Sequence, residues 1–242
     1  MSKSKGNTTD PLTIIKESGA DILRLWVALV DYSDDQRIGK QILQTTVDAY
    51  RKLRNTMRWM LGTLAHFSED VRVSDPQTMP ELERLMLHRL AELDTRVRAG
   101  YAAYDFQGVF RALFDFATGD LSAFYFDIRK DALYCDRPDA LRRRAARTVM
   151  DEVFMRLTAW LAPLTPFTME EAWTTRFPDG GTNCARILAD VDHRPHRRPA
   201  MLHQQRHRAD RFGDGRVVDQ LEQRGLVDHL ARRGGDVAAD LE

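Results

Sequence analysis

The sequence predicts an all-α protein, an antiparallel helical bundle followed by a poorly structured C-terminal tail. Apolar residues recur at the spacing of amphipathic helices through most of residues 13–173, and strand-type alternation is absent. From residue 191 onward the chain is rich in Arg and His, with Phe212 as its one aromatic residue. A segment so poor in apolar side chains does not predict a core of its own.

The N-terminal segment is expected to begin as a loop and to become helical. Residues 1–12 contain no apolar periodicity and end at Asp10-Pro11, a helix-start signal. Residues 13–30 carry an apolar side at helical spacing, which Gly19 interrupts. Residues 31–39 are polar and turn-like, so they predict a connection to the next helix.

Two long helices follow this connection. Residues 40–67 place apolar side chains at every third or fourth position, which indicates one amphipathic helix. Pro76 and Pro80 then mark a connecting segment, because proline interrupts helical hydrogen bonding. The third helix is predicted from Glu81 to about Tyr104, with its own buried stripe.

Polar residues mark the starts of the remaining helices. Asp105 is a predicted N-cap for an aromatic-rich fourth helix, and Asp139 is a predicted N-cap for a fifth. The fifth helix is expected to end before Pro163. A short sixth helix is expected to start at Thr168, because Thr168 and Glu171 have capping-box spacing.

Composition narrows the possible classes of function. The 242 residues hold 36 Lys and Arg and 36 Asp and Glu, so only local clusters can point to a nucleic acid. Cys135 and Cys184 lie far apart and do not indicate a disulfide scaffold or a zinc site. Neither a transmembrane run nor a secretory signal is evident, so we expect a cytoplasmic location, no membrane partner and no metal.

Two short segments carry a family resemblance. Residues 1–7 read Met-Ser-Lys-Ser-Lys-Gly-Asn, and residues 19–26 read Gly-Ala-Asp-Ile-Leu-Arg-Leu-Trp. The first is similar to the end of the Lys-Met-Ser-Lys-Ser loop of class I aminoacyl-tRNA synthetases. The second resembles the segment that follows this loop in the isoleucine-tRNA ligase branch. The resemblance runs from Met1 to about residue 190.

The resemblance implies a division of the chain into three parts. Residues 1–39 would be the end of the catalytic domain, with the signature loop and the helix after it. Residues 40–190 would be a helical bundle of the anticodon-binding type. Residues 191–242 show no resemblance, and both a native tail and a frame-shifted one stay open.

The resemblance also implies a role for the signature residues. In the family, a lysine of this loop stabilises the charge that develops on the phosphates of ATP. Here it corresponds to Lys3, and we take Ser2, Lys3 and Ser4 as the ATP-binding remnant. The complete family enzyme uses ATP and Mg²⁺. No nucleotide-binding fold is visible in this sequence, so we expect no bound cofactor and no catalytic residue that works in this chain alone.

A basic stripe on the second helix is the candidate tRNA-binding site. Arg51, Arg54 and Arg58 follow i, i+3, i+7 spacing and share one face, with Lys52 beside them. Such a stripe, opposite a buried apolar one, can follow a phosphate backbone. The resemblance implies tRNA as the partner, and tRNA-Ile in particular. A solvated helix face without a ligand is the alternative interpretation.

A second basic cluster lies on the fifth helix. Arg142, Arg143, Arg144 and Arg147 are interpreted as a charged helix surface. The carboxylates of Asp151 and Glu152, which follow on the same helix, are expected to pair with these arginines at helical spacing. We therefore expect this cluster to matter less for RNA binding than the stripe on the second helix.

Other functions stay open at this stage. The bundle is also consistent with a helical protein-interaction module, or with one half of a split synthetase whose catalytic domain is encoded separately. The valine and leucine branches of class I are further alternatives, although residues 20–26 and 31–33 look more like the isoleucine branch.

Overall fold

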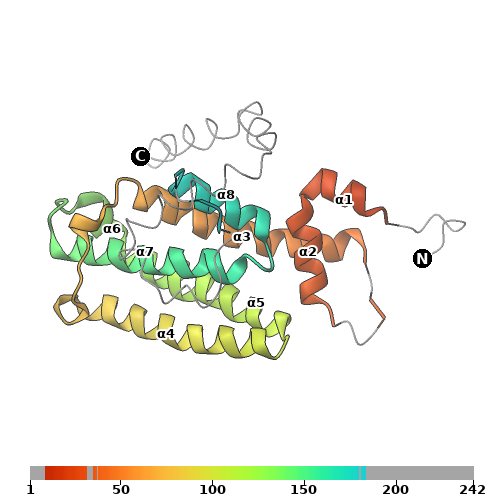
Figure 1. Ribbon diagram of the computed structural model, residues 1–242, viewed down its shortest axis with the longest axis horizontal. Coiled ribbons are helices and arrows are strands. Elements are labelled where there is room, and N and C mark those ends of the chain that lie inside the picture. Colours follow the sequence, from red (N-terminus) through yellow and green to blue (C-terminus); the bar gives the residue numbers. More distant parts are fainter. Residues whose placement is uncertain (1–8, 32–34, 37, 180, 184–242) are drawn as a thin grey trace, which may run out of the picture. The chain divides into compact units, whose positions relative to one another are not determined.

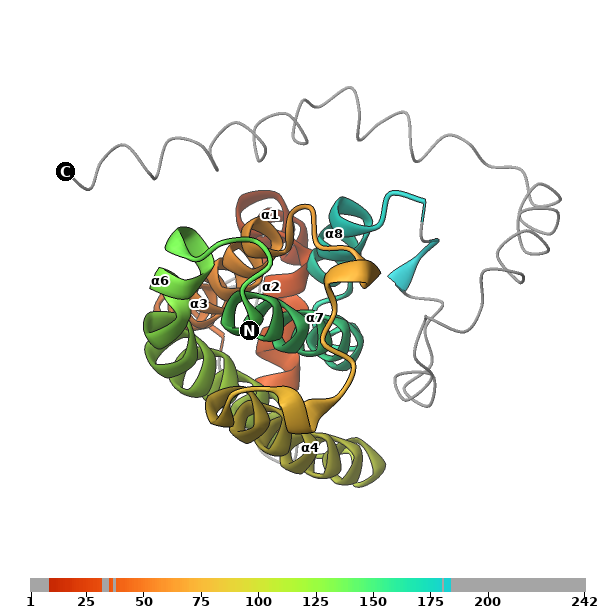
Figure 2. The same ribbon diagram turned by 90° about the vertical axis from the view of Figure 1, so that its left-hand side faces the viewer.

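A computed structural model describes residues 9–31, 35–36, 38–179 and 181–183 (Figures 1 and 2). Every regular element within these residues is helical, and they contain no strand. The predicted all-α fold is therefore confirmed. The predicted tail, residues 191–242, lies outside the described residues.

The first two helices are separated by a glycine, as the sequence predicted. Helix α1 spans Pro11–Ser18 and helix α2 spans Ala20–Leu29. Gly19 lies between them with φ of 91°, a conformation that favours residues without a Cβ atom. The Asp10 side chain accepts a hydrogen bond from the Leu12 backbone at 3.2 Å and so caps α1.

Helix α3 spans Lys40–Leu64 and is the longest helix in the described part of the chain. It buries Leu53, Met57, Met60 and Leu64. The prediction extended it to residue 67, but the chain turns at His66, whose φ is 60°. That left-handed residue directs Phe67 back toward the bundle and explains the earlier end of the helix.

The connection from α3 to the next long helix contains two short 3₁₀ helices. These are η2, Glu69–Val71, and η3, Pro76–Thr78, and helix α4 follows at Glu81–Ala102. Asp75 caps η3 by accepting a hydrogen bond from Gln77 N at 2.9 Å. The predicted third helix is therefore confirmed, and it ends two residues earlier than expected.

The predicted fourth helix is a continuous succession of three helical segments. Helix α5, Phe106–Asp115, is followed by a π-helical segment η4, Phe116–Phe126, and then by α6, Asp127–Cys135. The Asp105 carboxylate accepts a hydrogen bond from Gly108 N at 2.8 Å, so the predicted N-cap is confirmed. Wider π turns are uncommon, and periodicity alone did not predict them.

Helix α7, Leu141–Leu161, forms the centre of the bundle. Thirteen of its residues are buried, and it packs against α3, α4, α6 and the last helix (Figure 2). The predicted N-cap at Asp139 is wrong. Residue 140 occupies that position, and Asp139 pairs with Arg137 at 3.1 Å instead.

Helix α8 spans Pro166–Arg176 and starts earlier than the sequence predicted. Thr165 is its N-cap residue and makes no side-chain cap, so the predicted capping box at Thr168 is wrong. Thr168 lies within the first turn, where its backbone N–H needs an acceptor. The acceptor comes from another helix, because the Asp21 carboxylate reaches this position.

A buried ion pair joins α4 to α6. Glu83 is fully buried, and its carboxylate accepts two hydrogen bonds from Arg129, at 2.6 and 2.8 Å. The Tyr125 hydroxyl donates to the same carboxylate at 3.1 Å. Burial and the adjacent Glu83 raise the pKa of Tyr125 well above its usual value, so Tyr125 stays a donor. The pair thus fixes where the two helices cross.

Loss of one member of this pair should destabilise the bundle strongly. We expect Glu83→Ala to lower the free energy of unfolding by about 3–5 kcal/mol, because it leaves the Arg129 guanidinium without its partner. Urea unfolding followed by circular dichroism measures the change. Glu92→Ala is the control, since the exposed His88–Glu92 pair should contribute less than about 0.5 kcal/mol. Equal losses in both variants would contradict this assignment.

Candidate nucleic-acid interface

A carboxylate on α2 caps the N-terminus of α8. The buried Asp21 side chain accepts hydrogen bonds from Phe167 N at 3.4 Å, Thr168 N at 2.8 Å and Thr168 Oγ1 at 2.6 Å. These two backbone N–H groups belong to the first turn of α8, which has no side-chain cap of its own. An anion at this end also interacts favourably with the helix dipole.

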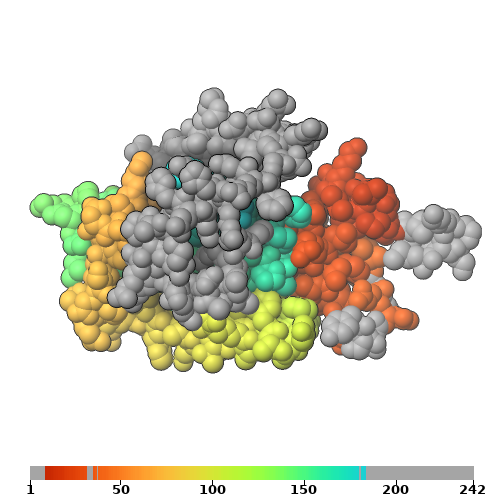
Figure 3. All heavy atoms as spheres, viewed as in Figure 1, coloured from red at the N-terminus to blue at the C-terminus, as the bar shows by residue number. Residues whose placement is uncertain are grey.

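Two further polar contacts fix the same junction. Arg24 of α2 donates to the Pro163 carbonyl at 2.9 Å, in the turn between α7 and α8. The hydroxyls of Tyr50 and Thr168 are hydrogen-bonded at 2.7 Å, which brings α3 to the same point. Figure 3 shows α1 and α2, coloured red to orange, against the teal side chains near the start of α8. Contacts of α2, α3 and α8 therefore set how α3 lies relative to the N-terminal helices.

We expect Asp21→Ala to lower the free energy of unfolding by about 2–4 kcal/mol. The change leaves two backbone N–H groups and the Thr168 hydroxyl without their buried acceptor. The matched control is Asp75→Ala, which removes an exposed local cap worth about 1 kcal/mol. Urea unfolding measures both. If the two variants lost similar stability, the Asp21 cap would be unimportant to the junction.

The four predicted tRNA-binding residues all lie on exposed positions of α3. Arg51, Lys52, Arg54 and Arg58 are exposed, whereas the stripe around Leu53 on the other side of the helix is buried. Arg51, Arg54 and Arg58 share one side of the helix, as their i, i+3, i+7 spacing requires, and Lys52 lies beside them. The spacing seen in the sequence is thus realised as a continuous basic face, here called the α3 face.

Carboxylates hold two of these four cations. Arg51 pairs with Asp48 at 3.3 Å, and Arg54 pairs with Glu171 of α8 at 3.7 Å. The side chains of both pairs are 39–64% exposed, so each contributes little to stability. Within the described part of the chain, Lys52 and Arg58 form no ion pair. These two are therefore the cations that meet an anion without displacing a carboxylate.

One residue of the α3 face escaped the sequence interpretation. Asn55 is exposed and lies four residues after Arg51 and three before Arg58, so it sits between them on the helix surface. Its amide offers both donors and acceptors, which cations do not. The helical spacing of Asn55 from Arg51 and Arg58 is visible in the sequence, but an uncharged side chain does not stand out in a basic stripe.

The second basic cluster has a structural role. Arg144 donates to the carbonyls of Val71 and Arg72, at 2.9 and 3.4 Å, and so holds the connection after α3. Arg142 binds Asp136 through two hydrogen bonds of 2.8 Å each. The predicted pairing of these arginines with Asp151 is wrong. The Asp151 carboxylate binds Arg72 and Arg176, two guanidiniums that lie far away in the sequence.

Other predicted site residues fall outside this description. Ser2, Lys3 and Ser4 lie outside the described residues. The residues that the structure does describe bring no three His, Cys, Asp or Glu side chains together as metal ligands. No helix among them combines the length and the apolar character needed to cross a bilayer.

Two known domain families match this chain. The anticodon-binding domain of tRNA ligases matches residues 83–197, and the class I tRNA synthetases of the I, L, M and V group match residues 1–39. Helix α3 lies between the two matched segments. The resemblance inferred from residues 1–7 and 19–26 is therefore confirmed.

Curated relatives point to one branch. The chain is 64% identical over 190 residues to the isoleucine–tRNA ligase of Caulobacter vibrioides, which covers 78% of this chain and 20% of the relative. It is 65% identical over 179 residues to the isoleucine–tRNA ligase of Brucella abortus, covering 74% and 18%. For the enzyme of Ruegeria pomeroyi the identity is 63% over 183 residues, covering 76% and 19%. The chain thus spans about a fifth of the length of these relatives.

Solved structures share the helical fold. A methionyl-tRNA synthetase of Mycobacterium tuberculosis bound to methionyl-adenylate aligns with a TM-score of 0.62 at 23% identity, over 79% of this chain and 38% of that one. A LeuRS from Agrobacterium radiobacter, solved as a ternary complex with tRNA and LeuAMS, aligns with a TM-score of 0.53 at 20% identity. That alignment covers 72% of this chain and 20% of the LeuRS. At such identities the likeness concerns the fold alone.

Proposed function

We propose that this chain, which belongs to the isoleucine–tRNA ligase family, binds the anticodon stem-loop of tRNA through the α3 face. The observation that carries the proposal is a row of three exposed arginines, with Lys52 beside it, opposite a buried stripe on one long helix. Such a row neutralises phosphates along an RNA strand and releases their counterions. The partner we propose is tRNA-Ile, in the cytoplasm, because the relatives are isoleucine–tRNA ligases.

The arrangement of charges supports phosphate contact over base reading. Lys52 and Arg58 form no ion pair among the described residues, and Arg51 and Arg54 exchange Asp48 and Glu171 for phosphates when RNA arrives. Phosphate contacts set the position of the RNA and carry no sequence information. Asn55 is the one amide among these cations, and it is suited to a base edge.

The contacts of α2 give the α3 face a defined place in a synthetase. The Asp21 and Thr168 contacts hold α2 against α8, and Tyr50 ties α3 to the same junction. We infer that this junction sets where the N-terminal helices α1 and α2 lie relative to the bound tRNA. In a complete enzyme of the family, Ser2, Lys3 and Ser4 would then contact the phosphates of ATP with its Mg²⁺.

A second candidate function is favoured by exposed apolar side chains near the N-terminal helices. Leu12 is 72% exposed, Val27 51% and Ile42 42%. Exposed apolar side chains mark a protein contact where they form one contiguous patch. They suit a catalytic domain, either within one chain or as a separately encoded partner. Co-purification of this chain with such a domain, lost in Leu12→Asp, is the measurement that separates this function from RNA binding alone.

We expect the triple variant Arg51→Ala, Arg54→Ala, Arg58→Ala to bind several tRNAs more weakly and to a similar extent. Each phosphate contact contributes about 0.7–0.9 to the steepness of log affinity against log salt, so the loss of three contacts should reduce that steepness by about 2–3. Helicity should be unchanged, because alanine favours helices and the buried stripe is intact. Filter binding at several salt concentrations measures both quantities.

The matched control removes the same charge elsewhere. Arg84, Arg96 and Arg111 are exposed on α4 and α5, and within the described residues they form no ion pair. Their triple change to alanine should leave binding within about twofold of wild type, since they lie off the α3 face. A second comparison uses double variants. Changing Lys52 and Arg58 to alanine should weaken tRNA binding more than changing Arg51 and Arg54, because Asp48 and Glu171 compete with phosphate for the latter two. Wild-type binding by the α3 triple variant would refute the RNA-binding role of this face.

A further inference from the structure

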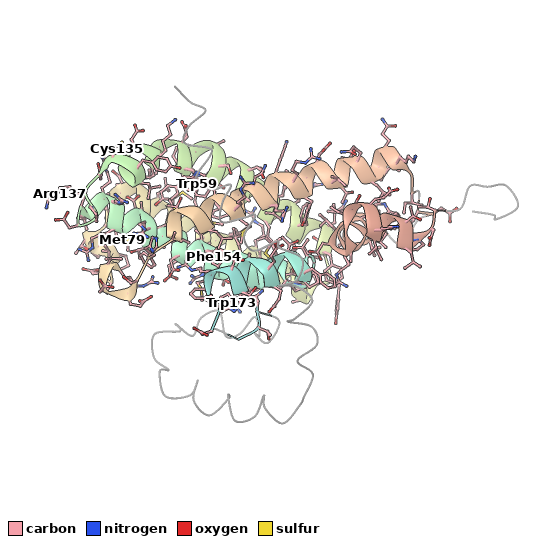
Figure 4. All side chains as sticks on the ribbon, turned by 90° about the horizontal axis from the view of Figure 1, so that it is seen from above. Trp59, Met79, Cys135, Arg137, Phe154 and Trp173 are labelled. Carbon is pink, nitrogen blue, oxygen red and sulfur yellow. The ribbon has the colours of Figure 1, made fainter. Side chains whose placement is uncertain are left out.

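Three arginines surround one phenyl ring at the C-terminal end of α3. The guanidinium carbons of Arg72, Arg147 and Arg176 lie 5.3, 5.5 and 6.0 Å from the centroid of the Phe67 ring. They come from the connection after α3, from α7 and from α8, so three segments distant in sequence meet here. Arg176 also lies 5.1 Å from the ring of Phe154, which Figure 4 labels on α7.

The carboxylates of this cluster are distributed unevenly. Arg72 binds Glu69 at 2.8 and 3.1 Å and Glu152 at 3.0 Å, and it also binds Asp151. Burial alone would lower the pKa of Arg72, but the hydrogen bonds and charges of Glu69 and Asp151 raise it. Arg72 thus has more negative partners than one guanidinium needs.

The other two arginines have fewer carboxylate partners than Arg72. Arg147 forms no ion pair with any described residue, and its one hydrogen bond goes to the Ala65 carbonyl at 2.5 Å. Arg176 is 91% buried and shares Asp151 with Arg72. Burial lowers the pKa of both Arg147 and Arg176; Arg143 lowers that of Arg147 further, whereas the Asp151 carboxylate opposes the decrease at Arg176. Arg147 and Arg176 together thus have one carboxylate partner in the described part of the chain, Asp151, which Arg72 also binds.

Three guanidinium nitrogens in this cluster have no hydrogen-bond acceptor among the described residues. Nε of Arg147, and Nε and Nη1 of Arg176, are buried without a hydrogen-bond partner. Buried polar groups in native proteins are nearly always paired, so unpaired donors on two adjacent cations indicate a missing ligand. Their number and charge suit an oxyanion, because guanidinium N–H groups match its acceptor oxygens.

The cluster lies on the course of the α3 face. Helix α8 runs alongside α3 (Figure 1), with Arg54 against Glu171 near its middle and Phe67 against Arg176 at its end. From Arg58 to the end of α3 at residue 64 the helix rises roughly 9 Å. A single RNA strand covers this distance in a few nucleotides.

We propose that Arg147 and Arg176 form a phosphate-binding site that takes one further phosphate of the RNA strand lying on the α3 face. The site rests on the proposed tRNA binding for the source of its ligand, while its anion chemistry follows from the cluster itself. The phosphate accepts hydrogen bonds from the unpaired N–H groups, with Arg147 on the solvent side because it is only half-buried. Phe67 holds the guanidinium planes through its ring face.

The first test uses inorganic phosphate on the full chain. Titration followed by NMR of the arginine Nε–Hε groups should shift the Arg147 and Arg176 signals saturably, whereas chloride at equal ionic strength should not. Arg129 Nε, which is bound to Glu83, is the internal reference for an intact fold. Absence of a phosphate-specific shift at Arg147 and Arg176 would overturn the anion site, whatever the RNA does.

The second test uses a tRNA-Ile transcript. Arg147→Gln should weaken binding roughly threefold to tenfold and lower the salt slope by about 0.7–0.9, as expected for one lost phosphate contact. Arg147→Lys keeps the charge and should recover part of the affinity. The matched control, Arg142→Gln, changes a residue on the same helix whose guanidinium is occupied by Asp136, and it should bind as wild type.

The outcomes separate the two proposals. Weaker binding by both Arg147→Gln and the α3 triple variant supports both. A second outcome is that the α3 triple variant loses affinity for tRNA while Arg147→Gln keeps the wild-type affinity and salt slope. That outcome leaves tRNA binding in place and overturns the additional phosphate site. If wild type fails to bind the transcript, the proposed function falls and RNA is the wrong source of the ligand, while a phosphate-specific NMR shift would still establish the anion site.

Discussion

The arrangement of the helices that matter for function depends on one buried carboxylate. Asp21 of α2 supplies the acceptor that the first turn of α8 lacks, across 147 residues of sequence. A buried helix end without an acceptor is costly, so α8 and α2 stabilise each other's position. Because Tyr50 bonds to the same Thr168 hydroxyl, α3 shares this junction. The helices next to the signature residues and the helix with the exposed cations are thus fixed relative to each other by polar contacts in a buried place.

Arginine has two different roles in this molecule, and its acid partners decide between them. Arg72, Arg129 and Arg144 are part of the fold, because buried carboxylates or backbone carbonyls accept their N–H groups. Those of the α3 face are exposed and weakly paired, which leaves them available to an external anion. Arg147 and Arg176 combine features of both groups: each donates to one group of the fold, the Ala65 carbonyl or the Asp151 carboxylate, and each keeps buried nitrogens without an acceptor. Such an intermediate state is what makes their cluster a candidate site.

The family relation and the local geometry support each other. Identity of 63–65% to isoleucine–tRNA ligases extends over most of the chain, although it covers about a fifth of each relative. The solved structures at 20–23% identity share the helical arrangement, so the fold tolerates wide changes in sequence. What the bundle requires is the apolar stripe on each helix and the buried polar junctions. The exposed cations of α3 are not needed for either, which is consistent with a role in binding.

Local sequence patterns were enough to predict the helices, the interruption at Gly19, the Asp105 cap and the exposed face of α3, because each follows from local periodicity or from a neighbour within four residues. They also indicated the family, through residues 1–7 and 19–26. The partners of the buried polar groups could be identified only from the packed helices: Asp21 with the start of α8, Glu83 with Arg129, and Asp151 with Arg72 and Arg176. These partners lie 25–147 residues apart. Local spacing predicted nearer partners for Asp151 and for the start of α8. A buried charge binds whichever opposite group the packed helices bring within reach, and sequence spacing does not reveal that group.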